Sequence, residues 1–152
     1  MEDSFRYRKI LAVAFGTDLS VKAVKEAVQL AKGLTAKLFV LHVRSPLEVP
    51  HHVEGGALSR VGGEEIADEI DKEERKFLEK AVELATANGI EAETGYVTDL
   101  SPFKAIIRVA QEQHCDLIVM GTRIRHGIPG YFGTSETQKV LANTDIPVVV
   151  VR

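Results

Sequence analysis

A glycine-rich segment between Gly121 and Ser135 is the part of the sequence whose residue types best suit ligand binding. It reads GTRIRHGIPGYFGTS. Its glycines let the backbone approach a bound group, and Arg123 and Arg125 supply positive charge. Successive backbone N–H groups can form an anion-binding nest, and a helix that begins near Ser135 would turn its N-terminus toward a phosphate. The segment is therefore typical of a phosphate site. The alternative is a glycine-rich turn with solvated arginines.

The elements that position this segment alternate between strands and helices. Short apolar runs predict strands, and apolar residues spaced three and four apart predict helices. Such alternation favours one parallel sheet with helices on both faces, and we expect a single domain over residues 1–152. The predicted strands are 8–15, 37–43, 90–97, 116–121 and 146–152, and the predicted helices are 21–33, 64–88, 101–113 and 135–143.

Three helix boundaries carry recognisable signals. Gly33 is expected to end the first helix, and Asn88-Gly89 to end the second. Ser101-Pro102 predicts a helix start, with an N-cap followed by proline at the first helical position. The exposed face of the second helix is acidic, and we interpret it as a solvated surface.

The predicted topology also indicates where a ligand would lie. In an open α/β sheet, ligands bind outside the carboxyl ends of the strands, at the point where the strand order reverses. The first predicted strand is followed by the loop Phe15–Ser20, and the fourth is followed by Gly121–Ser135. If those two strands are neighbours, the two loops face each other across one cleft.

Composition excludes several classes of protein. The chain has 152 residues and a net charge of −3, which argues against a nucleic-acid partner. Its single cysteine, Cys115, cannot form an internal disulfide or a multi-cysteine zinc site. The apolar runs are too short to span a bilayer, so we expect no membrane association. The first residues lack the apolar stretch of a signal peptide, and we expect a cytoplasmic protein.

The histidines do not form a recognisable catalytic or metal motif. His51 and His52 are adjacent in a long loop and are expected to be polar loop residues, not metal ligands. His42 lies in the second predicted strand, where a packing role is favoured. His114 and Cys115 could suggest a nucleophile, but a small buried cysteine is the usual case. We therefore expect no catalytic residue and no metal site.

The arrangement as a whole resembles the universal stress protein family, and the resemblance covers almost the whole chain. It implies a three-layer sandwich of the adenine nucleotide alpha hydrolase-like type, with a five-stranded parallel sheet in the order 3-2-1-4-5. It also implies a homodimer that pairs the last strands, here Val148 to Val151. The matching stretches are KILAVAFGTDLSVKAVKEAVQLAK, LFVLHV, SPFKAI, CDLIVMGTR, the glycine loop and KVLANTDIPVVVVR.

The ATP-binding branch of this family has a motif that this chain matches only in part. That branch has an aspartate after the first strand and a loop of Gly, two residues, Gly, nine residues, Gly, then Ser or Thr. Gly121 and Ser135 match the ends of the loop, but Ile124 and Thr134 replace glycines and Phe15 replaces the aspartate. A β-branched residue adopts positive φ poorly, and a phenylalanine can fill a pocket or stack on a ring but cannot accept a hydrogen bond.

The resemblance implies a binding site for ATP or another adenine nucleotide, with Mg²⁺ only alongside the nucleotide. The site residues that it assigns lie at the ends of the first, second and fourth strands and in the glycine loop. They are Ala14, Phe15, Thr17, Val43, Met120, Gly121, Arg123, Gly127, Gly130, Gly133, Thr134 and Ser135.

Three functions are compatible with the sequence. The first is a stress-response regulator that binds a nucleotide in the cleft after the first and fourth strands. The second is a dimeric interaction protein of the same family that binds no nucleotide. The third is an enzyme, at most a slow ATP hydrolase. The sequence favours it least because Asp18 is the only carboxylate in the two cleft loops.

Overall fold

The computed structural model describes residues 6–15, 21–44, 62–121 and 135–152, without the side chains of residues 62–71 and of Ser135. Strands and helices alternate along the chain, as predicted. Each boundary lies within about two residues of the expected one, which is the usual uncertainty of such bounds. The elements are β1 (Lys9–Phe15), α1 (Val21–Leu34), β2 (Lys37–Arg44), α2 (Gly62–Ala87), β3 (Ala92–Thr98), α3 (Pro102–Glu112), β4 (Leu117–Gly121), α4 (Ser135–Asn143) and β5 (Val148–Val151).

The strands form one parallel sheet in the order β3-β2-β1-β4-β5, which confirms the predicted fold class. β1 is the central strand. On one side Lys9 pairs with Lys37 of β2, and on the other Ile10 pairs with Leu117 of β4. The chain passes from β1 to β2 on one side and returns to β4 on the other, so the strand order reverses at β1.

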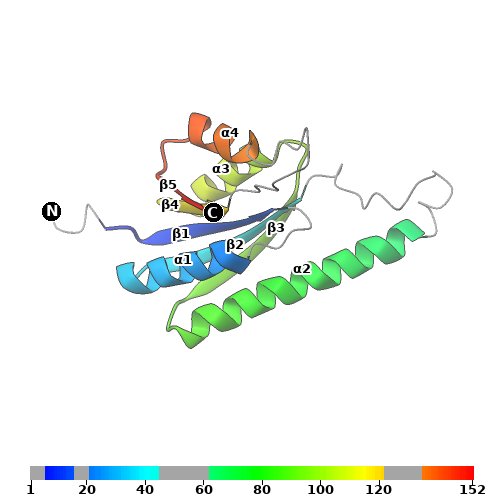
Figure 1. The fold of residues 1–152 in the computed structure, drawn as a ribbon, viewed down its shortest axis with the longest axis horizontal. Coiled ribbons are helices and arrows are strands. Elements are labelled where there is room, and N and C mark those ends of the chain that lie inside the picture. Colours follow the sequence, from blue (N-terminus) through cyan, green and yellow to red (C-terminus); the bar gives the residue numbers. More distant parts are fainter. Residues whose placement is uncertain (1–5, 16–20, 45–61, 122–134) are drawn as a thin grey trace.

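The helices cover both faces of the sheet (Figure 1). Side chains alternate along a strand, so the even-numbered residues of β1 point to one layer and the odd-numbered residues to the other. Ala12 packs in the cluster that includes residues of α1 and α2, and Val13 packs in the cluster that includes residues of α3 and α4. Burial on both faces explains why the sequence of β1 is a continuous apolar run.

A carboxylate at the amino end of the sheet joins β1 to β4. Asp116 Oδ2 accepts a hydrogen bond from the N–H of Arg8 at 2.8 Å, and its Oδ1 accepts from the N–H of Lys9 at 3.1 Å. The N–H of Asp116 donates to the carbonyl of Lys9 at 2.9 Å. These three bonds fix the register of the two strands before the apolar pairs begin.

The helix boundary signals had mixed outcomes. Gly89 takes φ 72° after α2, as predicted, and the N–H of Ile90 donates to the carbonyl of Ala85 at 2.9 Å. Gly33 was the wrong stop for α1: the helix continues to Leu34, and the left-handed residue is Thr35, at φ 55°. The N–H of Ala36, which donates to the carbonyl of Ala31 at 2.9 Å, closes the end of α1.

The start of α3 is where the sequence predicts it, but its bonds differ. Pro102 occupies the first turn, and Ser101 makes no side-chain capping bond. Instead, Asp99 Oδ1 accepts from the N–H of Ser101 at 2.8 Å, and Glu136 Oε2 accepts from the N–H of Phe103 at 3.0 Å. The serine marks the boundary, and two carboxylates satisfy the backbone donors.

Two glycines differ in what surrounds them, and this predicts opposite effects on stability. A Cβ on Gly95 of β3 would lie 2.7 Å from the Phe39 ring, whereas a Cβ on Gly33 in α1 meets nothing within 4 Å. We expect Gly95→Ala to lower the free energy of unfolding by about 1–3 kcal/mol because the ring must shift. We expect Gly33→Ala to raise it by about 0.5–1 kcal/mol because alanine favours the helix. Urea denaturation of both variants measures the two changes, and equal effects would contradict the packing argument.

Candidate functional site

The carboxyl ends of three neighbouring strands bring together five of the residues that the sequence assigns to the site. Phe15 pairs with Val43, and Gly121 lies one residue beyond Met120, the partner of Val13. Ala14, Val43 and Met120 are buried, and Phe15 is only 9% exposed. Ala14 belongs to the α1–α2 layer, whereas Phe15, Val43 and Met120 belong to the α3–α4 layer. The described part of the expected site is therefore an apolar wall at the strand ends.

The loop after β1 and the glycine-rich segment lie outside the described residues except at their ends. Thr17, Arg123, Gly127, Gly130, Gly133 and Thr134 lie outside the described residues, as does Ile124. Ser135 is the first residue of α4, as predicted.

The first turn of α4 is joined to two other elements. Thr137 is 3% exposed, and its hydroxyl donates to the carbonyl of Gly121 at 3.5 Å. The carboxylate of Glu136 bonds to the N–H of Phe103 at the start of α3, and Lys139 lies 3.3 Å from it on the same helix. The N-terminus of α4 is therefore held beside the carboxyl end of β4. The sequence reasoning did not identify Thr137 or Glu136.

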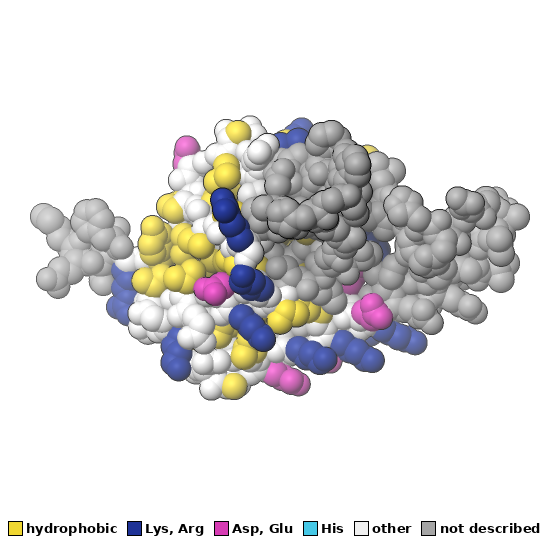
Figure 2. Space-filling view, in the orientation of Figure 1, with side chains coloured by type: hydrophobic (Ala, Val, Ile, Leu, Met, Phe, Trp, Pro, Cys, Tyr) yellow, Lys and Arg dark blue, Asp and Glu magenta, His cyan; other side chains and the backbone are white. Residues whose placement is uncertain are grey.

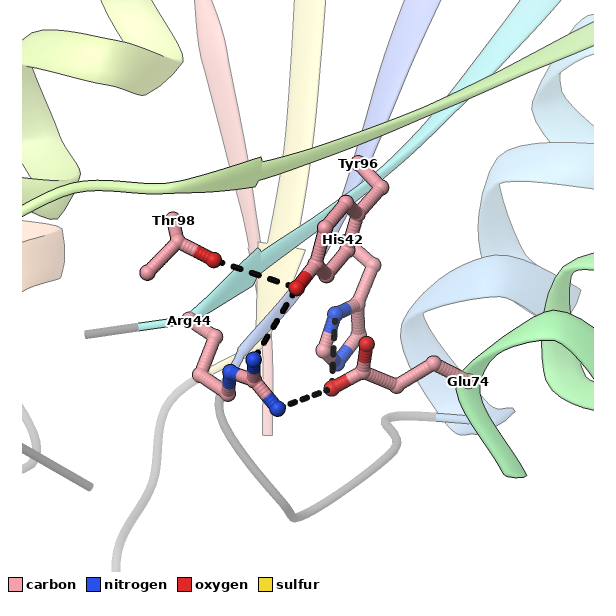
Figure 3. A network of polar contacts seen from close by, with 5 residues as sticks. All are labelled: His42, Arg44, Glu74, Tyr96 and Thr98. Carbon is pink, nitrogen blue, oxygen red and sulfur yellow. Dashed lines mark hydrogen bonds and ion pairs between the residues drawn. The ribbon is translucent and has the colours of Figure 1, made fainter. Parts of the chain in front are cut away.

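A second group of polar side chains lies between α2 and the ends of β2 and β3 (Figure 3). Glu74 Oε1 of α2 is 3.6 Å from His42 Nδ1 and 3.5 Å from a guanidinium nitrogen of Arg44. Arg44 also donates to the Tyr96 hydroxyl at 3.0 Å, and that hydroxyl lies 3.2 Å from the Thr98 hydroxyl. The rings of His42 and Tyr96 stack with centroids 6.1 Å apart. We call these five residues the Glu74 network.

Glu74 is a buried acidic residue that the sequence analysis did not identify, and its contacts in the Glu74 network explain how it can be buried. Glu74 is 4% exposed, and a buried carboxylate is stable only when charged or polar partners surround it. His42 is fully buried in the α2-facing layer, a position that fits the packing role expected for it. The missed signal was the position of Glu74, which lies three residues before Phe77 and so falls on the apolar face of the helix.

Cys115 does not have the properties of a nucleophile. It is 6% exposed, and burial raises the pKa of its thiol to about 11, although Lys9 partly opposes this. The thiol therefore stays protonated at neutral pH, and it packs in the α3–α4 layer. His114 is exposed and takes φ 56°, so this pair is a helix end followed by a core residue.

Comparison with known proteins assigns the chain to a family. The model of the universal stress protein family matches residues 6–152. The protein belongs to this family. It is similar to universal stress protein YxiE of Bacillus subtilis, with 34% identity over 157 residues that cover 96% of this chain and 99% of the relative.

Two solved structures show the same fold as this universal stress protein. It is similar to UspA from Lactobacillus plantarum, with a TM-score of 0.72 and 26% identity over 97% of this chain and 99% of that chain. It is also similar to a universal stress protein crystallised in complex with cAMP, with a TM-score of 0.67 and 24% identity over 96% of this chain and 97% of that chain.

Two further findings concern the described residues of this universal stress protein. No helix in the described ranges is long and apolar enough to cross a membrane. Among the same residues, no group of three histidine, cysteine, aspartate or glutamate side chains is arranged to hold a metal ion.

The Glu74 network predicts a large difference between two adjacent glutamates of α2. Removing one partner from a buried ion pair costs about 3–5 kcal/mol, whereas an exposed surface substitution changes stability by less than about 0.5 kcal/mol. We therefore expect Glu74→Ala to lower the free energy of unfolding by about 3 kcal/mol. Glu73→Ala, at an exposed position, is the matched control. Denaturation with urea compares the two variants, and a Glu74→Ala protein as stable as the control would contradict the role given to the network.

Proposed function

We propose that this universal stress protein is a stress-response regulator that binds an adenine nucleotide at the carboxyl ends of β1 and β4. The observation that carries the proposal is the reversal of strand order at β1, because ligands of open α/β sheets bind at this point. The ends of β1 and β4 therefore lie at the same edge, and the glycine-rich segment leaves the sheet there.

The base and the phosphate of a nucleotide would each find a suitable surface at this edge of the sheet. Phe15, at 9% the most exposed residue of the apolar wall, offers a ring on which a base can stack. The N-terminus of α4, held beside Gly121 by Thr137, suits a phosphate because the N–H groups of a first helical turn and the helix dipole attract anions. A protein of similar fold has been crystallised with cAMP, which supports an adenine mononucleotide as the first ligand to test.

The proposed role is binding, not catalysis. Among the described side chains of the first turn of α4, Glu136 is the only acid, and its carboxylate bonds to the N–H of Phe103. It is therefore engaged in structure and is not placed to activate water. Mg²⁺ would enter only with a polyphosphate such as ATP. A cytoplasmic location, expected from the sequence, belongs to the same proposal.

Substitution of Ser135 tests the phosphate part of this site. Aspartate and asparagine have similar size and both suit a helix start, but only aspartate adds a negative charge. We expect Ser135→Asp to weaken binding of cAMP, AMP and ATP at least tenfold and Ser135→Asn to leave it nearly unchanged. Calorimetric titration, with and without Mg²⁺, measures both. Absence of binding by the unmodified protein, or equal binding by the two variants, would overturn the proposal.

The edge strand β5 supports a second property, a homodimer. β5 pairs only with β4 among the described residues, and Val149 and Val150 are 36% and 37% exposed. Figure 2 shows hydrophobic side chains gathered beside lysine and arginine side chains on the face that carries α4 and the C-terminus in Figure 1. An apolar edge strand of this kind readily pairs with another chain.

We therefore propose that two copies pair through Val148 to Val151. Val150→Lys places a charge on this edge and is expected to convert a dimer into a monomer in analytical ultracentrifugation. Val21→Lys, at an exposed apolar position on α1, is the control and should remain dimeric. A monomeric unmodified protein would contradict the pairing. It would also remove the support for the alternative function, a dimeric interaction protein that binds no nucleotide.

A further inference from the structure

The opposite edge of the sheet is formed by β3, whose outer side pairs with no other strand in the described part of the chain. Odd-numbered residues of this region direct their backbone groups toward β2. The carbonyl of Glu91 accepts a hydrogen bond from the N–H of Leu38, and the N–H of Asp99 donates to the carbonyl of Arg44. Because backbone groups alternate in direction along a strand, Thr94 and Tyr96 direct their N–H groups outward. β3 therefore presents a row of backbone donors and acceptors at the edge of the sheet.

A groove lies between this edge and the flank of α2. One hollow of about 230 Å³ is lined by Glu74, Arg75, Leu78 and Tyr96. A second, of about 390 Å³, is lined by Arg75, Leu78, Glu79, Val82, Glu83 and Thr94. The two hollows share residues of α2, so they follow one another along the helix. The groove has the apolar side chains Leu78 and Val82 on one wall and the residues of β3 that direct their N–H groups outward on the other.

The charge of the groove indicates what would fill it. Glu79 and Glu83 are exposed along the α2 wall, and Arg75, which lines both hollows, offsets one of these two negative charges. On the other face of the sheet, Glu91 and Glu93 are more than half exposed beside the same strand, each near one lysine. The sequence of α2 as a whole has nine acidic residues against four basic ones. Lysine and arginine side chains would therefore be attracted to this edge.

We propose that the groove binds an extended segment of a protein partner in which basic and apolar residues alternate, and that this segment adds to β3 as a sixth strand. Its backbone would bond to Thr94 and Tyr96, which is how peptides join exposed sheet edges. Alternate side chains of an added strand face opposite sides of the sheet. The apolar row would enter the hollows beside Leu78 and Val82, and the basic row would face the glutamates of the opposite side.

Fluorescence anisotropy with the full chain and a labelled seven-residue peptide of alternating lysine and valine tests the proposal. We expect saturable binding of this peptide. A peptide with glutamate in place of lysine should not bind, nor should one whose backbone nitrogens are methylated along one edge. Thr94→Pro removes one outward N–H and leaves the inward bonds of β3 intact, so it should weaken binding at least tenfold. Thr94→Val keeps that N–H and should bind as the unmodified protein does.

The two glutamates on the other face of the sheet give a separate readout. Glu91→Lys combined with Glu93→Lys should weaken binding of the basic peptide at least fivefold and allow the acidic peptide to bind. If Thr94→Pro disturbs folding, the methylated peptide with the unmodified protein answers the same question. Equal binding of the methylated and unmethylated peptides, or no saturable binding of the basic peptide, would overturn the proposal. The same variants are expected to bind nucleotide as the unmodified protein does, because the groove lies on the edge strand and not at the ends of β1 and β4. Nucleotide titration of these variants therefore separates a failure of this proposal from a failure of the proposed function.

Discussion

The central position of β1 is the constraint on which the rest of this structure depends. Its apolar residues are buried on both faces, so two helical layers must cover it, and its backbone is bonded on both sides, so β2 and β4 must flank it. Asp116 holds the start of β4 against the start of β1 through two backbone donors. Once these strands are in register, their carboxyl ends lie together, and the loops that follow them leave from the same edge of the sheet.

Most of the fold could be predicted from the sequence because it depends on local periodicity. The continuous apolar runs of β1 and β4 indicate strands buried on both faces, and the alternation of elements indicates a parallel sheet. The strand order came from the family resemblance and is confirmed by the structure. The predicted helix end at Gly33 was wrong for a local reason. A glycine can adopt the left-handed conformation easily but need not adopt it, and in this chain Thr35 adopts it instead.

The candidate site was less predictable because it depends on contacts between distant residues. Phe15, Val43 and Met120 lie at one edge of the sheet, and their assignment to a ligand site stays a prediction. Periodicity could not indicate that Thr137 bonds to Gly121 or that Glu136 reaches α3. The Glu74 network joins residues that are more than 20 positions apart in three elements, and no short motif encodes it. The one available signal was a glutamate on an apolar helix face.

The strand directions have a practical consequence for labelling this protein. All strands run parallel, so Val151 at the end of β5 pairs with Gly121 at the end of β4. Lys22 also bonds to the backbone carbonyl of Arg152, which ties this residue to α1. A fluorophore or affinity tag attached at Arg152 would therefore crowd the edge of the sheet where β1 and β4 end. One attached before β1 would lie at the opposite edge and leave that region accessible.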